Sequence, residues 1–499
     1  MVATGSRSTL RDEQGVPVFG NFINGEWVAA SSGGTFANTN PANPSEVVGH
    51  FAASEAADIE AAVTAASEAY PGWAATSAIA RANILYKASE ILNSRLQEVA
   101  RDLTREEGKT FREAVGETSR AVAILRYYAG ELQQPDGEHY PSANPNTLLF
   151  TVREPLGVVG IITPWNFPVA IPVWKAIPAI AFGNTVVMKP ASFTPLTTVH
   201  IAEVLQEAGL PAGVFNLVTG SASKVGDPLV KDDRVVAVSF TGSDTVGNGI
   251  KKIASERGAK VQLELGGKNP AIVLADADLD HALQQVLNGA MMSTGQKCTA
   301  TSRAIVDRRI ANELTERLAK KVEGLKVGDP LKDETIIGPA ISEDAASTIQ
   351  GQIDRAKADG IQLVAGGARP EISGGHFLAP TLFADVDNES FLGQEELFGP
   401  VLGVIPVDGL DEAIAVANSV RFGLSASIFT RDIASALAFV RGIHAGIVHV
   451  NSETAGAEPH VPFGGYKGSS SYSREQGKAA REFYTQLKTV YFDPPPMQG

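Results

Sequence analysis

Short apolar runs alternate with helical stretches through most of this 499-residue chain. They stand at residues 158–162, 185–188, 215–218, 235–240, 271–274, 303–306, 401–407, 425–429 and 446–450. Runs this short favour strands over helices, and apolar strands that alternate with helices are typical of a parallel sheet covered on both faces. Because the alternation starts again after Asn269, the sequence predicts an α/β fold with two parallel-sheet domains.

The chain ahead of the first apolar run is predicted to be mostly helical. Residues 22–27 favour a β-hairpin with Asn-Gly in its turn. We expect a helix that Ser54 caps and that runs through Tyr70, a second helix from about Ala80, and more helix to about residue 133. Residues 134–148 are rich in proline, asparagine and glycine, which is typical of a turn or linker.

The overall composition excludes several classes of protein. With 44% hydrophobic and 20% charged residues, the chain is predicted to be globular rather than disordered. A formal net charge of −14 argues against nucleic acid and anionic membranes as partners. The longest uncharged stretch, residues 155–174, holds several prolines and makes a poor membrane span. One cysteine and the absence of a secretory pattern in residues 1–15 predict a cytoplasmic location.

Cys298 is the single cysteine of the chain, so disulfides cannot stabilise it. A lone cysteine is often an inert residue packed as a small hydrophobe. Here it stands in Gly295-Gln296-Lys297-Cys298-Thr299, a run of small and polar residues that does not make an apolar core site. These surroundings favour a nucleophile.

Two segments that follow predicted strands indicate a nucleotide site, although no complete Gly-x-Gly-x-x-Gly motif is present. Phe240-Thr241-Gly242-Ser243 has the form of a strand, a turn and a helix start, which can receive a phosphate. Lys189-Pro190-Ala191-Ser192 adds a cation and a hydroxyl at the end of a strand, where open sheets bind ligands. Taken alone, the first segment also fits a plain connection and the second a surface lysine.

Two more segments carry polar groups suited to acyl chemistry. Asn166 is fixed between Pro164 and Pro168, so its amide could stabilise an oxyanion, although a simple proline-rich turn also fits. Glu264 stands among leucines, where desolvation would make it a general base, unless it faces water on an alternating strand.

Together these motifs resemble the aldehyde dehydrogenase superfamily over nearly the full length of the chain. Glu264 and Cys298 are 34 residues apart, as in that family, and all motifs stand in the family order. The motifs are Pro164-Trp165-Asn166-Phe167-Pro168, Lys189-Pro190-Ala191-Ser192, Phe240-Thr241-Gly242-Ser243, Leu263-Glu264-Leu265-Gly266-Gly267-Lys268, Gly295-Gln296-Lys297-Cys298 and Glu396-Leu397-Phe398-Gly399-Pro400.

The resemblance implies two Rossmann-type parallel-sheet domains plus a small oligomerisation element. It places a cofactor-binding domain at residues 1–133 and 155–263 and a catalytic domain at residues 264–477. Residues 134–154 and 478–499 would form the oligomerisation element, in which 488–492 make an edge strand that needs a partner. A homodimer or homotetramer is therefore expected.

The resemblance also implies the reaction. Cys298 would attack the aldehyde, the Asn166 amide would hold the oxyanion, and Glu264 would activate water against the resulting thioester. Lys175 and Glu475 match positions that relay the proton away. The implied cofactor-binding residues are Ile162, Thr163, Pro164, Trp165, Lys189, Ser192, Gly226, Phe240, Gly242, Ser243, Leu265, Glu396 and Phe398, and no metal ion is implied.

Position 192 predicts the cofactor. NAD-specific relatives often carry glutamate there, and its charge repels a 2′-phosphate. Ser192 removes that repulsion and leaves Lys189 to attract phosphate, so NADP is predicted to be accepted and preferred, with NAD as the second option.

The prediction of the substrate rests on fewer residues than the resemblance to the superfamily. Trp174 stands where succinic semialdehyde dehydrogenases usually carry arginine. The segment 460–485 resembles instead the 2,5-dioxopentanoate (alpha-ketoglutaric semialdehyde) dehydrogenase branch, whose members form 2-oxoglutarate in the breakdown of sugar acids. Arg303 is interpreted as structural. The alternatives are a succinate-semialdehyde or broad-specificity enzyme, a coenzyme A-acylating dehydrogenase, a non-catalytic binding protein on the same fold, and a thiol hydrolase.

Overall fold

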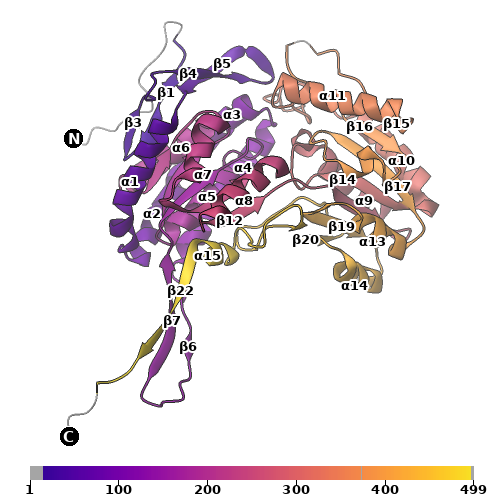
Figure 1. The fold of residues 1–499 in the computed structure, drawn as a ribbon. Helices are drawn as coiled ribbons and strands as arrows, with labels where there is room; N and C mark the ends of the chain where they lie inside the picture. Colours follow the sequence, from indigo (N-terminus) through magenta and orange to yellow (C-terminus); the bar gives the residue numbers. More distant parts are fainter. Residues whose placement is uncertain (1–14, 373, 496–499) are drawn as a thin grey trace.

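The computed structural model describes residues 15–372 and 374–495, and two seven-stranded sheets dominate its fold (Figure 1). The expectation about a secretory pattern concerns mainly residues 1–14, which lie outside the described part. The first sheet has the order β12-β11-β8-β9-β10-β2-β3. Its strands are β2 (Asn21–Ile23), β3 (Glu26–Val28), β8 (Val158–Ile162), β9 (Thr185–Lys189), β10 (Phe215–Leu217), β11 (Val235–Thr241) and β12 (Lys260–Glu264).

The pairing in this sheet confirms the predicted parallel core and the predicted hairpin. Strands β8 to β12 pair in parallel, whereas β2 and β3 form an antiparallel hairpin at one edge. Helices cover both faces because neighbouring apolar residues point to opposite sides. Val159 and Ile161 pack with helices α2 to α6, and Val158 and Ile162 pack with α1, α7 and α8. The helices of this half are α1 (Ala56–Ala74), α2 (Ala78–Ser94), α3 (Leu96–Glu107), α4 (Phe111–Glu131), α5 (Ala170–Ala181), α6 (Pro195–Ala208), α7 (Asp227–Lys231) and α8 (Asp244–Glu256).

The second sheet repeats this plan, with the order β15-β16-β17-β14-β13-β19-β20. All its pairs are parallel except the one between β15 and β16. Its strands are β13 (Asn269–Val273), β14 (Thr301–Asp307), β15 (Gln362–Ala365), β16 (Thr381–Ala384), β17 (Val401–Val407), β19 (Ser425–Phe429) and β20 (Ile447–Val450). Helices α9 (Leu279–Met291) and α10 (Arg308–Glu323) cover one face, and α11 (Glu343–Ala358), α13 (Leu410–Asn418) and α14 (Ile433–Gly442) pack on the other.

Two expectations for the N-terminal helices were wrong. The N-cap of helix α1 (Ala56–Ala74) is Glu55 and not Ser54, because the Ser54 hydroxyl is engaged with the Asn21 side chain at 2.8 and 3.0 Å. The helix also continues past Tyr70 to Ala74, where the indole of Trp73 is buried and donates to the Ile180 carbonyl. The next helical stretch is broken at Arg95 into α2 and α3.

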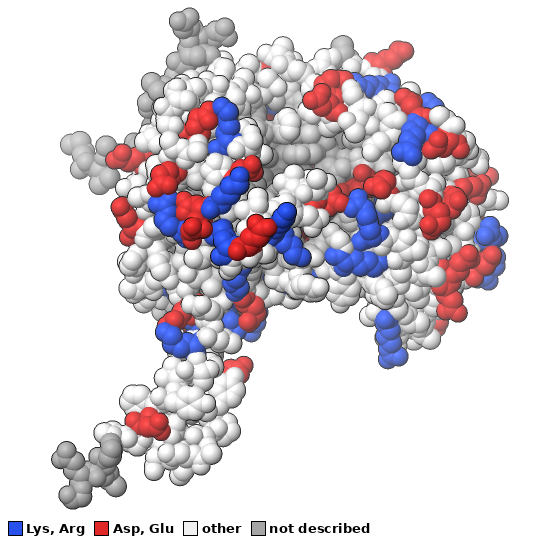
Figure 2. All heavy atoms as spheres, viewed as in Figure 1, with Lys and Arg blue, Asp and Glu red and all other residues white. Residues whose placement is uncertain are grey.

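A small three-stranded sheet projects from the body of the molecule (Figure 1). Its order is β22-β7-β6, with β6 (His139–Tyr140), β7 (Leu148–Pro155) and β22 (Thr485–Phe492) all antiparallel. The predicted C-terminal edge strand is confirmed, and it pairs with β7 on one side only. Part of the expected linker 134–148 forms β6 instead. Figure 2 shows mostly uncharged side chains on this projection, and Leu487 and Tyr491 of β22 are exposed.

Charged side chains of both signs are interspersed over the rest of the face drawn in Figure 2. None of the helices in the described part of the chain is long and apolar enough to cross a membrane. The same described residues hold no cluster of three or more histidine, cysteine or acidic side chains that could bind a metal ion.

The strand order of the first sheet places a binding site. The chain proceeds from β8 to β9 and β10 in one direction and from β11 to β12 in the other, so the order reverses between β8 and β11. Ligands of open parallel sheets bind in the crevice at the carboxyl ends of strands where the order reverses. The segments after Ile162 and Thr241 lie at this point.

Candidate active site

The loop that carries Cys298 is tightly folded. After α9, Ser293, Thr294 and Gly295 take the left-handed conformation, with φ of 54°, 55° and 65°. Gly295 is required there because a Cβ atom would lie 2.1 Å from the Gly399 carbonyl oxygen. The Asn269 amide donates to the Cys298 carbonyl oxygen at 2.8 Å. Two strained residues, a glycine and an anchored carbonyl thus fix where the sulfur lies.

Cys298 is partly exposed, yet its thiol lies in surroundings that disfavour a thiolate. Burial of the sulfur raises the pKa of Cys298 to about 12, and the carboxylates of Glu396 and Glu264 raise it further. The thiol is therefore protonated near neutral pH, and a base or a change of surroundings must help to form the nucleophile.

The predicted oxyanion donor is aimed at the cysteine loop. Asn166 is buried, and its Nδ2 donates to the Gln296 carbonyl oxygen at 3.0 Å, two residues before Cys298. An amide carries two N–H bonds, so the second can donate elsewhere. The structure therefore brings Asn166 and Cys298 together.

A buried ion pair that sequence reasoning missed holds this arrangement. Lys109 Nζ lies 2.5 Å from Glu117 Oε2 and donates to the Asn166 carbonyl oxygen at 2.7 Å. Glu117 Oε1 accepts from the backbone N–H groups of Val169 and Ala170 at the start of α5. Charged groups this deeply buried persist only when they are fully paired. Several charges crowded into the turn at residues 106–110 were the available signal.

Helix α4 reaches the cysteine loop as well. Glu113 Oε1 accepts from the Ser293 backbone N–H at 2.7 Å, in the strained segment before Cys298. Glu113 Oε2 also accepts from the hydroxyl and backbone N–H of Thr110, the N-cap of the helix. Residues 109–117 thus connect the Asn166 segment to the Cys298 loop.

Glu264 ends strand β12 and is buried, as its apolar neighbours predict. Ser470 Oγ donates to Glu264 Oε2 at 2.6 Å, whereas Oε1 has no hydrogen-bond partner within the described residues. Burial raises the pKa of Glu264 well above the ordinary value, and the Glu475 carboxylate raises it further, while the Ser470 hydrogen bond lowers it. Such a carboxyl group binds a proton more readily than an ordinary glutamate, which suits a general base.

The two predicted relay residues form a buried ion pair beside Glu264. Lys175 Nζ contacts Glu475 Oε1 and donates to Ser239 Oγ at 2.9 Å. Trp174 Nε1 donates to Glu475 Oε2 at 2.7 Å, so Trp174 helps to hold the acid. The charges of both Glu475 and Lys175 act on the pKa of Glu264. All five predicted catalytic residues therefore gather in one region.

The predicted cofactor residues lie mainly at the reversal of strand order. Ile162 to Trp165 leave β8, and Ser243 precedes α8 directly after β11. Ile162, Phe240 and Leu265 are buried in the core beneath α8 and support this surface from below. The helix can approach closely because Gly242 and Gly247 lack side chains: a Cβ at Gly247 would meet Leu265 at 2.5 Å. Gly226 is buried near Ile162.

Lys189 ends β9 at the same edge of the sheet, and Ser192 follows three residues later. Lys189 Nζ donates to the Pro190 carbonyl oxygen at 2.9 Å, and burial alone lowers the pKa of Lys189 to about 8. Ser192 Oγ donates to the Gly220 carbonyl oxygen at 3.0 Å. No described carboxylate contributes to the Lys189 shift, so the lysine is a cation without a nearby acid.

Glu396 and Phe398, from the second half of the chain, lie beside the predicted cofactor surface. Glu396 Oε1 accepts from the Gly267 backbone N–H at 2.9 Å, and burial raises the pKa of Glu396 to about 7. Phe398, with a positive φ of 55°, packs edge-on against Trp165 at 5.5 Å between ring centroids. The contact joins the predicted cofactor surface to the Cys298 half.

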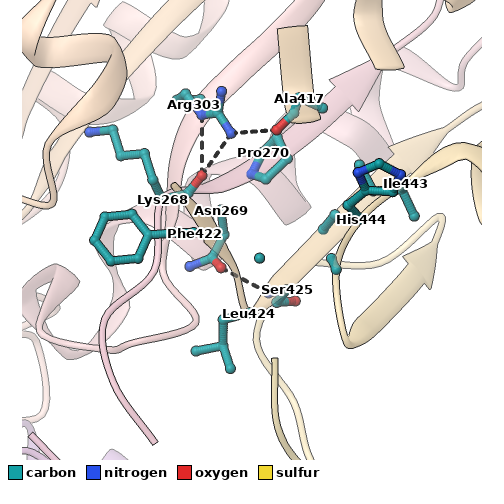
Figure 3. Close-up of a pocket in the computed structure, with 13 residues that line it drawn as sticks. Lys268, Asn269, Pro270, Arg303, Ala417, Phe422, Leu424, Ser425, Ile443 and His444 are labelled. Atoms are coloured by element: carbon teal, nitrogen blue, oxygen red, sulfur yellow. Dashed lines mark hydrogen bonds between the residues drawn. The ribbon is translucent and has the colours of Figure 1, made fainter. Parts of the chain in front are cut away.

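Arg303 is structural, as predicted from the sequence. It is 1% exposed and lines the pocket in Figure 3, where its guanidinium donates to the Lys268 and Ala417 carbonyl oxygens. It also donates to Asn388 Oδ1 and to the Val416 carbonyl oxygen. These five hydrogen bonds use all its nitrogens, so no donor is left for a ligand.

The raised pKa of Cys298 predicts how the thiol titrates. As long as the pH is below the pKa of a thiol, the thiolate fraction rises tenfold with each unit of increasing pH. With a pKa of about 12, alkylation by iodoacetamide in the ligand-free protein should increase about tenfold per unit from about pH 7 to about pH 9. Because the chain has one cysteine, the rate follows directly from mass spectrometry.

The control for this titration is a free thiol, whose alkylation rate levels off above its pKa of about 8.5. Glu396→Gln removes a charge that disfavours the thiolate and should speed the reaction of Cys298 at fixed pH. A plateau of the wild-type rate below about pH 8 would contradict the assigned burial of the sulfur.

Comparisons with known proteins show which family the chain is similar to. A model described as "Aldehyde dehydrogenase family" matches residues 27–490. The alpha-ketoglutaric semialdehyde dehydrogenase of Bacillus subtilis (strain 168) is 50% identical over 477 residues, which cover 95% of this chain and 98% of that protein. The 2,5-dioxopentanoate dehydrogenase of Saccharolobus solfataricus is 42% identical over 93% of this chain and 98% of its own. The solved betaine aldehyde dehydrogenase of Staphylococcus aureus in complex with NAD+ has a TM-score of 0.93 at 35% identity, covering 96% of this chain and 95% of that one.

Proposed function

The chain belongs to the aldehyde dehydrogenase family, and we propose that it oxidises 2,5-dioxopentanoate (alpha-ketoglutaric semialdehyde) to 2-oxoglutarate. The relatives with this activity in their names match nearly its whole length. The observation that carries the proposal is the meeting of Cys298, Glu264 and Asn166 from three separate segments. In this proposal the first sheet forms the core of the cofactor-binding domain and the second that of the catalytic domain.

Cys298 acts as the nucleophile. After the thiol loses its proton to solvent, the thiolate adds to the aldehyde carbon. The carbonyl electrons move onto the oxygen, which the free N–H of Asn166 and the Cys298 backbone N–H stabilise. A bound nicotinamide cofactor would supply the acceptor for the hydride that leaves this carbon. A thioester on Cys298 remains.

Glu264 then controls release of the product. It takes a proton from water, and the resulting hydroxide adds to the thioester carbon and expels the Cys298 thiolate. The Glu264 carboxyl keeps that proton readily because burial and Glu475 favour its neutral form. The Lys175–Glu475 ion pair, in which Lys175 also donates to Ser239, then carries the proton away from Glu264.

The residues at the reversal of strand order fit a dinucleotide. Ser243 lies at the start of the 13-residue helix α8, whose N–H groups attract a pyrophosphate. Lys189 and Ser192 are placed at the next strand end to hold the adenosine ribose. We propose that NADP is preferred, because Lys189 lacks an acidic neighbour that would repel a 2′-phosphate.

Replacing Ser192 by glutamate should reverse this preference. In Ser192→Glu the new carboxylate would repel the 2′-phosphate and accept from the ribose hydroxyl of NAD, so kcat/KM with NADP should fall about a hundredfold while that with NAD is kept. The matched control is Ser192→Gln, which has the same length without the charge. If both variants lose NADP activity equally, size and not charge governs position 192.

Steady-state kinetics test the proposed substrate. We expect kcat/KM for 2,5-dioxopentanoate to exceed that for succinic semialdehyde and for pentanal, with 2-oxoglutarate as the product. Coenzyme A should change neither rate nor product, because Glu264 supplies the base for hydrolysis. A higher kcat/KM for succinic semialdehyde would refute the substrate, and an acyl-coenzyme A product would refute hydrolysis.

We also propose that the projecting sheet joins copies of this chain into a dimer or tetramer. Strand β22 pairs with β7 on one side and presents exposed apolar side chains, including Leu487 and Tyr491. An exposed apolar edge strand is a template for pairing with another strand. Light scattering at micromolar protein should therefore give at least the dimer mass, and a monomer mass would contradict the proposal.

A further inference from the structure

Arg120 on helix α4 is a partly buried arginine whose donors are left unused. Its Nε and Nη2 atoms are covered, yet neither has a hydrogen-bond partner within the described residues. An unpaired buried donor costs about 1–3 kcal/mol, and more when it is charged. Such a group calls for an explanation, and one explanation is a ligand that supplies the missing acceptor.

The two unused atoms form the side of a guanidinium that binds carboxylates. Their N–H bonds point the same way, so both oxygens of one carboxylate can accept from them. Arg309 shows this geometry in the same molecule, with Nε and Nη2 at 2.9 and 2.8 Å from the two Asp307 oxygens. Arg120 has the same pair of donors, Nε and Nη2, but no carboxylate accepts from them within the described residues.

Two carboxylates lie near Arg120, and neither is bonded to it in the described part of the chain. Glu117 and Glu458 both favour the charged guanidinium, although burial, the larger effect, lowers the pKa of Arg120. Glu117 is already occupied by Lys109 and by the start of α5. Glu458 is exposed to solvent.

The position of Arg120 relates it to the reacting sulfur. Arg120 is one turn of α4 beyond Glu117, on the same face, and Glu117 fixes the segment that carries Asn166. Glu458 belongs to the loop 454–463. One end of this loop contacts the residue after Cys298, through Thr454 Oγ1 and the Thr299 carbonyl oxygen at 2.7 Å. At the other end Phe463 packs on Trp174. Arg120 therefore faces the loop that borders the catalytic residues.

Three other buried cations around the site already have partners. Lys109 and Lys175 are paired with Glu117 and Glu475, and Arg303 has a carbonyl or amide acceptor for every nitrogen. Trp174, at the position where arginine binds the carboxylate in succinic semialdehyde dehydrogenases, donates to Glu475 instead. The carboxylate of a semialdehyde needs a different partner here.

We propose that Arg120 binds the distal carboxylate of the semialdehyde through Nε and Nη2, and so selects aldehydes that carry an acid at the far end. This inference rests on the proposed function. Arg120 as a whole is half-buried, so this long side chain would have room to turn Nε and Nη2 toward a bound substrate. Once bound there, the carboxylate holds the aldehyde end of the chain at Cys298.

The test compares a charged and a neutral aldehyde of the same length, 2,5-dioxopentanoate and pentanal. Arg120→Met keeps most of the side-chain volume but removes the charge. It should lower kcat/KM for 2,5-dioxopentanoate about 10- to 100-fold, mainly through KM, as expected for lost charged hydrogen bonds. Activity on pentanal should stay within about twofold, which also shows that the variant folds. Arg120→Lys, which keeps the charge without the fork, should fall between the two.

Arg126→Met is the matched control, because Arg126 is an exposed arginine on the same helix. It should change neither substrate. An equal loss of kcat/KM for both aldehydes in Arg120→Met would mean that Arg120 has a structural role. No loss for either aldehyde would mean that another residue binds the substrate carboxylate. Each result overturns the inference.

A failure of the proposed substrate has a different signature. If the wild type prefers succinic semialdehyde over 2,5-dioxopentanoate, the substrate proposal fails. The inference still stands in that case if Arg120→Met abolishes the preference for succinic semialdehyde over butanal, and it falls if the preference persists. If the wild type prefers no acid-bearing aldehyde over its neutral counterpart, both proposals fail.

Discussion

Cys298→Ala is expected to abolish aldehyde oxidation, with kcat reduced at least about ten-thousandfold. The substitution removes the sulfur and leaves a methyl group, so no covalent bond to the aldehyde carbon can form. No other residue can replace it, because Cys298 is the single cysteine of the chain. Production of reduced cofactor, followed by absorbance with each aldehyde, measures the loss.

The backbone around Cys298 should tolerate this change. The loop is held through the Cys298 carbonyl oxygen and the left-handed segment before it, and neither depends on the sulfur. The thermal unfolding midpoint and the affinity for the cofactor should therefore match the wild type, which separates lost chemistry from lost structure. Cofactor reduction at more than about one hundredth of the wild-type rate would contradict a cysteine nucleophile.

Glu264→Gln is expected to stop the reaction halfway. Glutamine cannot take a proton from water, so hydrolysis of the thioester should slow about a hundred- to ten-thousandfold. The cysteine and the oxyanion donor remain, so the first turnover should still occur. Stopped-flow absorbance should show a burst of about one equivalent of reduced cofactor per site, followed by a slow steady rate.

The burst depends on the thiol being activated without Glu264. Glu264 is one of the groups that raise the pKa of Cys298, so its replacement by glutamine does not hinder formation of the thiolate. The Ser470 hydroxyl, which is fixed by the Gly465 N–H at 2.6 Å, can hold the glutamine amide in place of the acid. A slow reaction without a burst would mean that Glu264 is needed before the thioester forms, and this would contradict a role in hydrolysis alone.

Much of the fold was predictable from the sequence because apolar periodicity determines it. Runs such as 158–162 and 401–407 bury both faces, and each became a strand of a parallel sheet. The start of α1 was mispredicted because a local pattern favoured Ser54 as a cap. A distant residue, Asn21, binds that hydroxyl instead, and no local pattern reports such a contact.

The site was predictable to the extent that motifs name its residues. Cys298, Glu264 and Asn166 carry recognisable neighbours, and the structure brings them together. Arg120 and Lys109 stand on or before a helix without such a motif, and their importance depends on which buried acids surround them. That information exists only after the chain folds, because Lys109 meets the Asn166 carbonyl from 57 positions away.

The most direct measurement is the intact mass of the Glu264→Gln variant, quenched with acid after the burst with NADP and 2,5-dioxopentanoate. The account predicts a mass increase equal to one acyl group per chain, carried by the peptide that contains Cys298 and released by hydroxylamine. Cys298→Ala treated in the same way should gain no mass. An unmodified Glu264→Gln protein after a full burst of reduced cofactor would contradict a covalent thioester on Cys298.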